Sequence, residues 1–203
     1  GQAVSQLHLG GGTPTFLSDD ELTRLMAMLR DAFKIAPGAE ISIEVDPRTA
    51  TPERLAHFAS LGFNRLSFGV QDFDADVQKA VHRVQSFESV QALMQSARAL
   101  GYESINADLI YGLPKQTPES FARTIAQVAA LRPDRIAAYS YAHLPEMFKS
   151  QAVMDAATMP SAWRQAFSQV LCTSSGIICC CKSQFMDSVP KLGKSSAGRC
   201  TKG

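Results

Sequence analysis

The first 171 residues of this 203-residue chain contain no cysteine, because all five cysteines fall between Cys172 and Cys200. A secreted domain built on disulfides would carry cysteines throughout its core, so the folded part is expected to be cytosolic. An excess of one charge is also missing, since 20 Lys and Arg oppose 19 Asp and Glu. This balance gives no electrostatic footprint for nucleic acid or an anionic membrane. No apolar run reaches the roughly 20 residues that a bilayer span needs.

The length fits one domain with a real core, and the hydrophobic fraction of 45% is typical of globular proteins. The chain starts at Gly1, directly before a strand, so we expect a piece of a longer protein. Regular patterning supports a domain over residues 1–163, followed by an irregular tail over 164–203. This Cys- and Ser-rich tail is either disordered or translated out of frame, and we favour the second interpretation.

Five runs alternate polar and apolar residues with the period of two that is typical of strands with two unlike faces. They lie near residues 4–9, 40–46, 65–70, 104–110 and 135–141. Helical patterns separate them, so the sheet is expected to be parallel and covered by helices on its outer face. A closed eight-fold barrel fills its interior with Val, Ile and Leu. Because the inner face here is polar, we predict an α/β fold, a wider partial (βα) barrel holding a polar ligand.

Capping signals place the helices between these strands. Ser18 with Glu21 forms a capping box, and Thr51 and Thr117 each precede a proline suited to a first helical turn. Further helical patterns lie near residues 73–82 and 87–99. The buried stripe of the first helix is predicted to consist of Leu22, Leu25, Met26, Leu29 and Phe33.

A glycine run, Gly10-Gly11-Gly12, follows the first strand. Glycines let a ligand approach the backbone and leave N–H and C=O groups accessible. The run lacks both the GxGxxG spacing of a dinucleotide site and the GK[ST] ending of a P-loop. Taken alone, it is equally typical of a tight turn.

Two carboxylates, Glu44 and Asp108, lie on inner-face positions near the ends of their strands, close to Gln71. Each carboxylate can accept two hydrogen bonds from a ribose diol or an ammonium group. The alternative is a structural pair with Arg65 or Arg83. Arg83 itself either forks onto a carboxylate or is a solvated surface residue.

Other polar residues have simpler interpretations. His8 faces inward on the first strand and is expected to be a hydrogen-bonded core histidine rather than a ligand. His143 lies just past the last strand, within reach of a ligand, and residues 46–48 are read as turn chemistry. The consecutive Cys179, Cys180 and Cys181 have no metal-binding spacing, so no metal site is predicted.

Taken together, five segments resemble the oxygen-independent coproporphyrinogen III oxidases. They are LHLGGGTPT at 7–15, IEVDPR at 43–48, FGVQDF at 68–73, DLIYGLPKQTPESF at 108–121 and YAHLP at 141–145. The resemblance covers about residues 4–163 in order. It implies a radical S-adenosylmethionine (SAM) enzyme on a partial (βα) barrel, here truncated at both ends.

The resemblance also implies roles for individual residues in binding two SAM molecules. The glycine-loop contacts would be Gly11, Gly12 and Thr13, through backbone and hydroxyl groups. Glu44 would hold one SAM. The second SAM would be surrounded by Gln71, Arg83, Asp108 and Ala142.

In this family a [4Fe-4S] cluster reduces SAM to a deoxyadenosyl radical, which removes hydrogen from a propionate side chain. The propionate then loses carbon dioxide and becomes a vinyl group. Two such events convert coproporphyrinogen III to protoporphyrinogen IX. The implied partners are the porphyrinogen substrate and an electron donor protein, with no nucleic acid or membrane, in a cytoplasmic monomer.

The chain departs from the family because it has no CxxxCxxC cluster motif and no carboxyl-terminal porphyrinogen-side domain. The 203 residues alone are therefore expected to be inactive. The alternative is a haem chaperone that shares the barrel. Such relatives typically have Gln-Ser-Phe at 71–73 and Gly-Gln-Thr at 115–117, and lack the ending at 141–145. All three features favour the oxidase.

Overall fold

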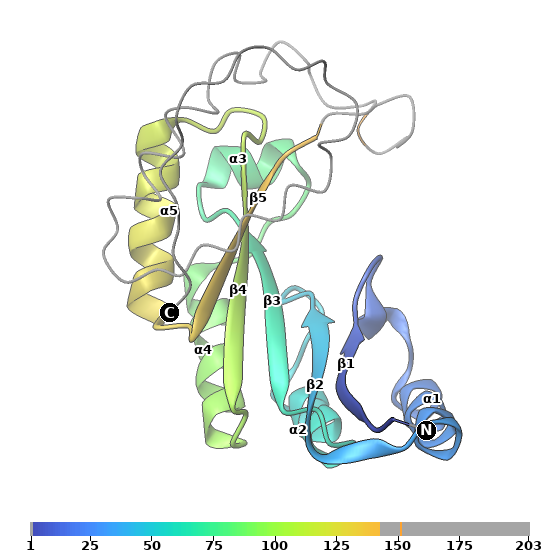
Figure 1. Ribbon diagram of the computed structural model, residues 1–203. Coiled ribbons are helices and arrows are strands. Elements are labelled where there is room, and N and C mark those ends of the chain that lie inside the picture. Colours follow the sequence, from blue (N-terminus) through green and yellow to red (C-terminus); the bar gives the residue numbers. More distant parts are fainter. Residues whose placement is uncertain (1, 143–150, 152–203) are drawn as a thin grey trace, which may run out of the picture.

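Five parallel strands form one sheet in the computed structural model, which describes residues 2–142 and residue 151. The strands follow one another in chain order across the sheet, as Figure 1 shows. They are β1 (Val4–Leu9), β2 (Ile35–Val45), β3 (Arg65–Gln71), β4 (Ser104–Tyr111) and β5 (Arg135–Ser140). Every neighbouring pair is parallel. The predicted α/β partial barrel is therefore confirmed.

The helices begin where the capping signals predict. Ser18 and Glu21 form a reciprocal capping box, and the hydroxyls of Thr51 and Thr117 each accept a backbone N–H of the first turn. The helices are α1 (Asp19–Ala32), α2 (Pro52–Ser60), α3 (Ala75–Ala80), α4 (Phe87–Ala99) and α5 (Pro118–Leu131), with a 3-10 turn η1 (Pro14–Phe16). Within residues 2–142, none of these helices is long and apolar enough to cross a membrane.

The core lies between the sheet and the helices. Ile43, Leu66 and Ile105 point from three strands into this layer and are almost fully buried. Phe58 of α2 and Phe121 of α5 are also fully buried there, and α4 packs against both of these helices. Each such side chain contributes about 1.5–3 kcal/mol by leaving water. Because the apolar face of the sheet is used in this way, its polar face is left for the inner side of the barrel.

Two boundaries differ from the sequence prediction. Phe33 was placed in the buried stripe of α1, but it is 54% exposed. The helix ends at Ala32, and Phe33 has the extended φ of −128°, so its side chain leaves the stripe. β2 begins at Ile35 rather than near residue 40, because Ile35 pairs with Val4 before Pro37-Gly38 interrupts the alternation.

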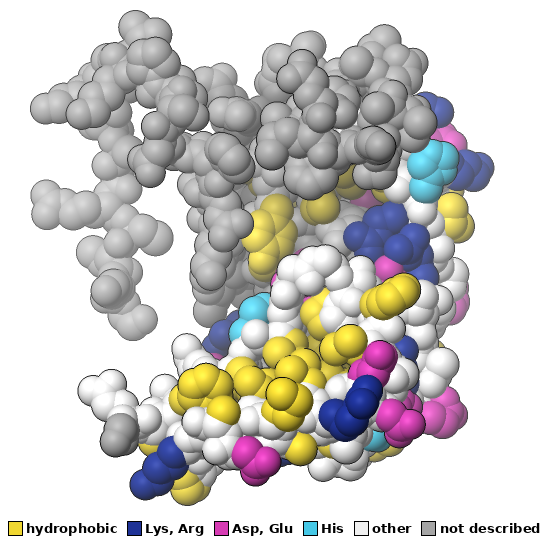
Figure 2. Space-filling view, turned by 90° about the vertical axis from the view of Figure 1, so that its right-hand side faces the viewer, with side chains coloured by type: hydrophobic (Ala, Val, Ile, Leu, Met, Phe, Trp, Pro, Cys, Tyr) yellow, Lys and Arg dark blue, Asp and Glu magenta, His cyan; other side chains and the backbone are white. Residues whose placement is uncertain are grey.

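The free edge of β1 is apolar. A groove there is lined by Val4, Leu7, Leu29, Phe33 and Ile35. Figure 2 looks at this side of the molecule and shows hydrophobic side chains gathered on its lower part. Within the described residues β1 pairs only with β2, so this edge remains open.

Candidate functional site

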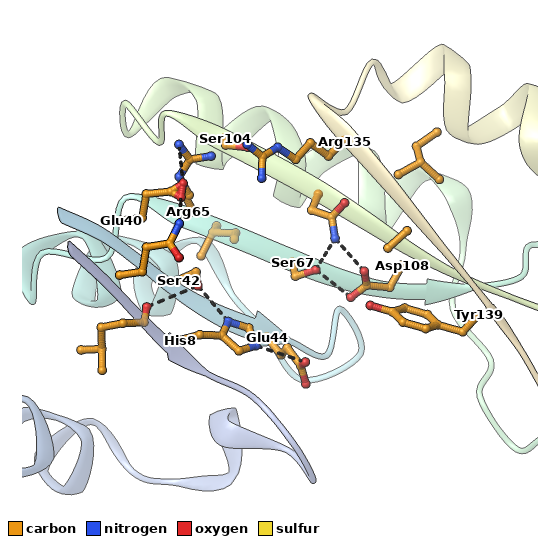
Figure 3. A pocket seen from close by; sticks show the side chains of 16 residues that line it. His8, Glu40, Ser42, Glu44, Arg65, Ser67, Ser104, Asp108, Arg135 and Tyr139 are labelled. Carbon is orange, nitrogen blue, oxygen red and sulfur yellow. Dashed lines mark hydrogen bonds and ion pairs between the residues drawn. The ribbon is translucent and has the colours of Figure 1, made fainter. Parts of the chain in front are cut away.

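Two adjoining cavities open on the polar inner face of the sheet. The lumen cavity has a volume of about 570 Å³ and the rim cavity about 460 Å³. Both are lined by Glu44, Ser67, Asp108 and Tyr139. From these shared residues the lumen cavity, drawn in Figure 3, extends to the amino ends of the strands, with Gln6, His8, Glu40, Ser42, Arg65, Ser104 and Arg135. The rim cavity extends to the loops at the carboxyl ends, with Gly12, Thr13, Asp46, Arg48, Gln71 and Arg83.

Asp108 is held from two strands. The Ser67 hydroxyl donates to one carboxylate oxygen over 2.7 Å, and the Asn106 amide donates to the other over 2.6 Å. Burial raises the pKa of Asp108 to about 6, and the nearby charge of Glu44 acts in the same direction. The carboxylate is therefore oriented, and no Lys or Arg among the described residues forms an ion pair with it, as expected of a group that awaits a donor from a ligand.

Glu44 fastens the glycine loop to β2. Its Oε2 accepts the backbone N–H of Gly11 over 3.2 Å, and its Oε1 lies 3.5 Å from Nε2 of His8. Gly11 and Gly12 have φ values of 81° and 62°, in the left-handed region that favours glycine. A Cβ on Gly10 would lie 2.4 Å from the His8 ring and 2.8 Å from the Glu44 carboxylate. The loop is therefore a turn, and it also brings its backbone close to the side chains of the site.

The structural-pair alternative for the two carboxylates is wrong. Arg65 pairs with Glu40 over 3.0 Å, and Arg83 pairs with Asp46 over 3.2 Å. Neither arginine contacts Glu44 or Asp108 among the hydrogen bonds and ion pairs of the described residues. Asp108 therefore stays available to a ligand, whereas Glu44 is already held by the N–H of Gly11 and by His8.

Gln71 is turned toward the rim cavity by a local distortion. The β3–β4 register shifts between Gly69 and Gln71, and Gln71 has a left-handed φ of 63°. Such a shift re-aims a side chain, and a left-handed non-glycine residue costs on the order of 1–3 kcal/mol. Its buried Oε1 has no hydrogen-bond partner, and neither has the buried Nε of Arg83. One unpaired acceptor and one unpaired donor fit the ammonium and carboxylate of an amino-acid ligand such as SAM.

Asp46 has more contacts than turn chemistry alone predicts. Arg48 donates to it from its backbone N–H, its Nε and its terminal nitrogen, the last over 2.6 Å, and Arg83 donates over 3.2 Å. Burial disfavours its ionised form, but the bonds from Arg48 and the charge of Arg83 outweigh it and lower the pKa of Asp46. The carboxylate thus anchors Arg83 beside the rim cavity. The presence of two arginines and one loop aspartate was the feature of the sequence from which this anchor could have been predicted.

A buried polar network behind the rim was not predicted. Asp72, Gln116 and Thr124 are at most 2% exposed, and both Gln116 and Thr124 donate to the Asp72 carboxylate. Gln116 also accepts the N–H of Gly112 and donates to the carbonyl of Ile110. Polar loop residues follow no period, so the sequence held no signal for this network.

The remaining predicted residues have mixed outcomes. His8 is not a core residue, because its side chain is 56% exposed in the lumen cavity, where its Nδ1 lies 2.8 Å from the Ser42 hydroxyl. Inner-face positions meet a cavity rather than packed side chains. Ala142 follows β5 but does not line either cavity, and its carbonyl accepts from Gln151 over 3.2 Å. His143 lies outside the described residues.

No cluster of three His, Cys, Asp or Glu side chains able to hold a metal occurs within residues 2–142 and 151. All five cysteines lie outside this described part. The described residues therefore fit a polar organic ligand and offer no thiolate for an iron–sulfur cluster.

Residues 1–128 match the Radical SAM superfamily. Over 161 residues the chain is 54% identical to the oxygen-independent coproporphyrinogen III oxidase of Escherichia coli K12, covering 79% of this chain and 35% of that protein. The Pseudomonas aeruginosa PAO1 protein of the same name is 52% identical over 162 residues, with the same coverage. A solved structure of coproporphyrinogen III oxidase from Escherichia coli superposes with a TM-score of 0.77 at 52% identity, over 84% of this chain and 39% of that one. The chain spans about a third of the length of these curated relatives.

Proposed function

The chain belongs to the radical SAM superfamily, and on that premise we propose that its rim cavity binds SAM for the oxidation of coproporphyrinogen III. In the whole protein the reaction is the oxygen-independent oxidative decarboxylation of this substrate to protoporphyrinogen IX. The observation that carries the proposal is the meeting of Glu44, Gln71 and Asp108 in one cavity, with none of the described arginines on either carboxylate.

Each polar group around the rim cavity has a distinct role in binding. Asp108, fixed by two donors, accepts hydrogen bonds from a ribose diol or an ammonium group. Arg83 and Gln71 offer the unpaired donor and acceptor that suit the carboxylate and ammonium of the methionine part.

The glycine loop and the end of β5 complete this proposed binding site. Glu44 holds one SAM and also fixes the loop through the N–H of Gly11. The other predicted contacts are Gly12 and Thr13, which line the rim cavity, and Ala142, which lies beyond β5. When bound, SAM with its iron–sulfur cluster supplies the radical chemistry, whereas these residues bind and orient it.

The substrate assignment is supported by the relatives. The eight curated proteins that are 42–54% identical all bear the name oxygen-independent coproporphyrinogen III oxidase. Their names favour the oxidase over the haem chaperone on the same barrel, as do Asp72 and Lys115. We further propose that the whole protein works as a cytoplasmic monomer that receives electrons from a donor protein.

A chimera tests this function. Residues 4–142 replace the matching segment of the Escherichia coli relative, and the product is loaded anaerobically with its cluster. We expect the chimera to form protoporphyrinogen IX from coproporphyrinogen III in the presence of SAM. Asp108→Ala should abolish turnover, whereas Asp20→Ala on the exposed face of α1 should preserve it. A folded, cluster-loaded chimera without turnover would contradict the assignment.

A further inference from the structure

Two arginines stand at the amino end of the lumen cavity, far from the rim. Arg65 is the first residue of β3 and Arg135 the first residue of β5, so they flank β4 from either side. The register pairs Arg65 with Ser104 and Arg135 with Asn106, on the same face as Asp108. Figure 3 shows both guanidinium groups at one end of the cavity, next to Ser104.

The two arginines at this end differ in their partners. Glu40 pairs with Arg65 over 3.0 Å and also accepts a hydrogen bond from Gln6. Arg135 is exposed and forms no ion pair or side-chain hydrogen bond within residues 2–142 and 151. Among the residues that line this end of the cavity, Arg65 and Arg135 accompany one carboxylate, Glu40, while the neighbouring Asp134 accepts the backbone N–H of Ile105. In addition, the Nε of Arg65 is buried without a hydrogen-bond partner.

This arrangement suits a carboxylate. A guanidinium group presents a planar fork of N–H donors that matches the two oxygens of a carboxylate. Arg135 has a fork without a partner among the described residues, Arg65 lines the same end with its Nε buried and unpaired, and Ser104 lies on the strand between them. A single carboxylate at this place would pair with Arg135.

We infer that Arg135, Arg65 and Ser104 form a carboxylate-binding subsite that anchors one propionate of the tetrapyrrole substrate. This inference rests on the proposed function for the identity of the ligand. Arg65 and Gln71 lie six positions apart at the two ends of β3, about 20 Å at the rise of a strand. The amino-acid carboxylate of a SAM bound at Gln71 therefore lies too far away to be the occupant. A tetrapyrrole carries propionates around its ring, so a ring along the lumen presents one to the rim while another reaches the arginines.

The first test concerns the subsite alone. The ¹⁵N-labelled 203-residue chain is titrated with propionate, and the Nε–Hε resonances of Arg65 and Arg135 are followed by NMR. Arg135→Gln and Arg65→Gln identify the two signals, and Arg123, exposed on α5, is the reference. We expect saturable shifts at both subsite arginines, and no such shift at Arg123 or with the neutral analogue propionamide. Equal responses to propionate and propionamide, or none at Arg135, would overturn the subsite.

The second test concerns the source of the carboxylate. Binding of coproporphyrin III, the stable aromatic form of the substrate, is followed by its own fluorescence. Arg135→Gln should weaken binding about tenfold, the effect of losing one charged hydrogen-bonding partner. Arg135→Lys should weaken it less, and Arg123→Gln not at all. SAM affinity should be the same in all four proteins, which shows an intact rim cavity.

Failure of the tetrapyrrole as the occupant and failure of the proposed reaction give different experimental results. Unchanged coproporphyrin affinity in Arg135→Gln, despite a response to propionate, would overturn the tetrapyrrole as the occupant. An inactive chimera together with weakened coproporphyrin binding in Arg135→Gln would contradict the proposed reaction and support the subsite.

Discussion

Gln116 donates a hydrogen bond from its side-chain amide to the carboxylate of Asp72, which joins the loop after β4 to the loop after β3. Asp72 directly follows Gln71, whose backbone is left-handed, and Gln116 also holds Gly112 at the end of β4. Thr124 of α5 donates to the same carboxylate over 2.6 Å. Two strand ends that carry proposed SAM contacts are therefore fixed relative to one another by side chains that line neither cavity.

Removing this link should lower both stability and binding. Gln116→Ala leaves a buried carboxylate and the N–H of Gly112 without their partner, so we expect a loss of about 1–3 kcal/mol in the free energy of unfolding. SAM affinity should also fall, because Gln71 loses its support. Urea denaturation and calorimetry measure the two effects. Gln95→Ala, at an exposed position of α4, is the control. Equal stability of the two variants would show that the link contributes nothing.

The pKa of Asp108 predicts a pH dependence of binding. Since burial raises this pKa to about 6, the carboxylate that accepts hydrogen bonds from SAM is lost as the pH falls through that value. At about pH 5 only about a tenth of the molecules retain the ionised form, so the affinity should fall about tenfold from neutral pH. Calorimetric titrations across this range measure it. Asp108→Asn should bind weakly at every pH, and a parallel pH profile in that variant would assign the effect to another group.

The same raised pKa predicts that the stability of the ligand-free chain changes with pH in the opposite direction to the affinity for SAM. Between the ordinary value of 3.8 and the folded value of about 6 the native state binds more protons than the unfolded state. The stability contributed by protonated Asp108 is therefore lost as the pH rises through about 6. Asp108→Asn should remove this trend in denaturation experiments.

Gly10 leaves space that the site requires. Gly10→Ala places a methyl group against the ends of the His8 and Glu44 side chains, so both must shift at the edge of the site. We expect weaker SAM binding with little loss of stability, because the methyl group meets only the ends of two exposed, flexible side chains. The matched variant is Ala3→Gly, which lies before β1 and outside both cavities. Wild-type affinity in Gly10→Ala would rule out a close approach at this loop.

Arg83 is predicted to need its planar fork. Arg83→Lys retains the charge near Asp46 but loses the buried, unpaired Nε donor of a residue that lines the rim cavity. A point charge does not reproduce a two-pronged contact, so SAM affinity should fall by about 1–3 kcal/mol. Lys in place of the exposed, paired Arg123 should leave affinity unchanged. Identical calorimetric titrations for the two variants would remove Arg83 from the site.

Periodic features of the fold were predictable from the sequence, because local residue patterns determine strand faces and helix caps. The start of α5 at Pro118 and the inner positions of Glu44 and Asp108 are examples. Features that depend on packing between distant loops were not predictable. The link from Asp72 to Gln116 spans 44 positions. His8 was misjudged because alternation indicates which face a residue occupies and not whether that face meets a core or a cavity.

Binding of SAM to the 203-residue chain, measured by calorimetry for the wild type and for Glu44→Ala and Asp108→Ala, tests the central claim most directly. The account predicts saturable binding to the wild type at the rim cavity. Asp108→Ala should weaken it by about 1–3 kcal/mol, the usual cost of losing a charged hydrogen-bond acceptor. Glu44→Ala should also weaken it, because the carboxylate adjoins the same cavity and fixes its glycine loop. No binding to the folded wild-type chain, or equal affinity in all three proteins, would contradict the account.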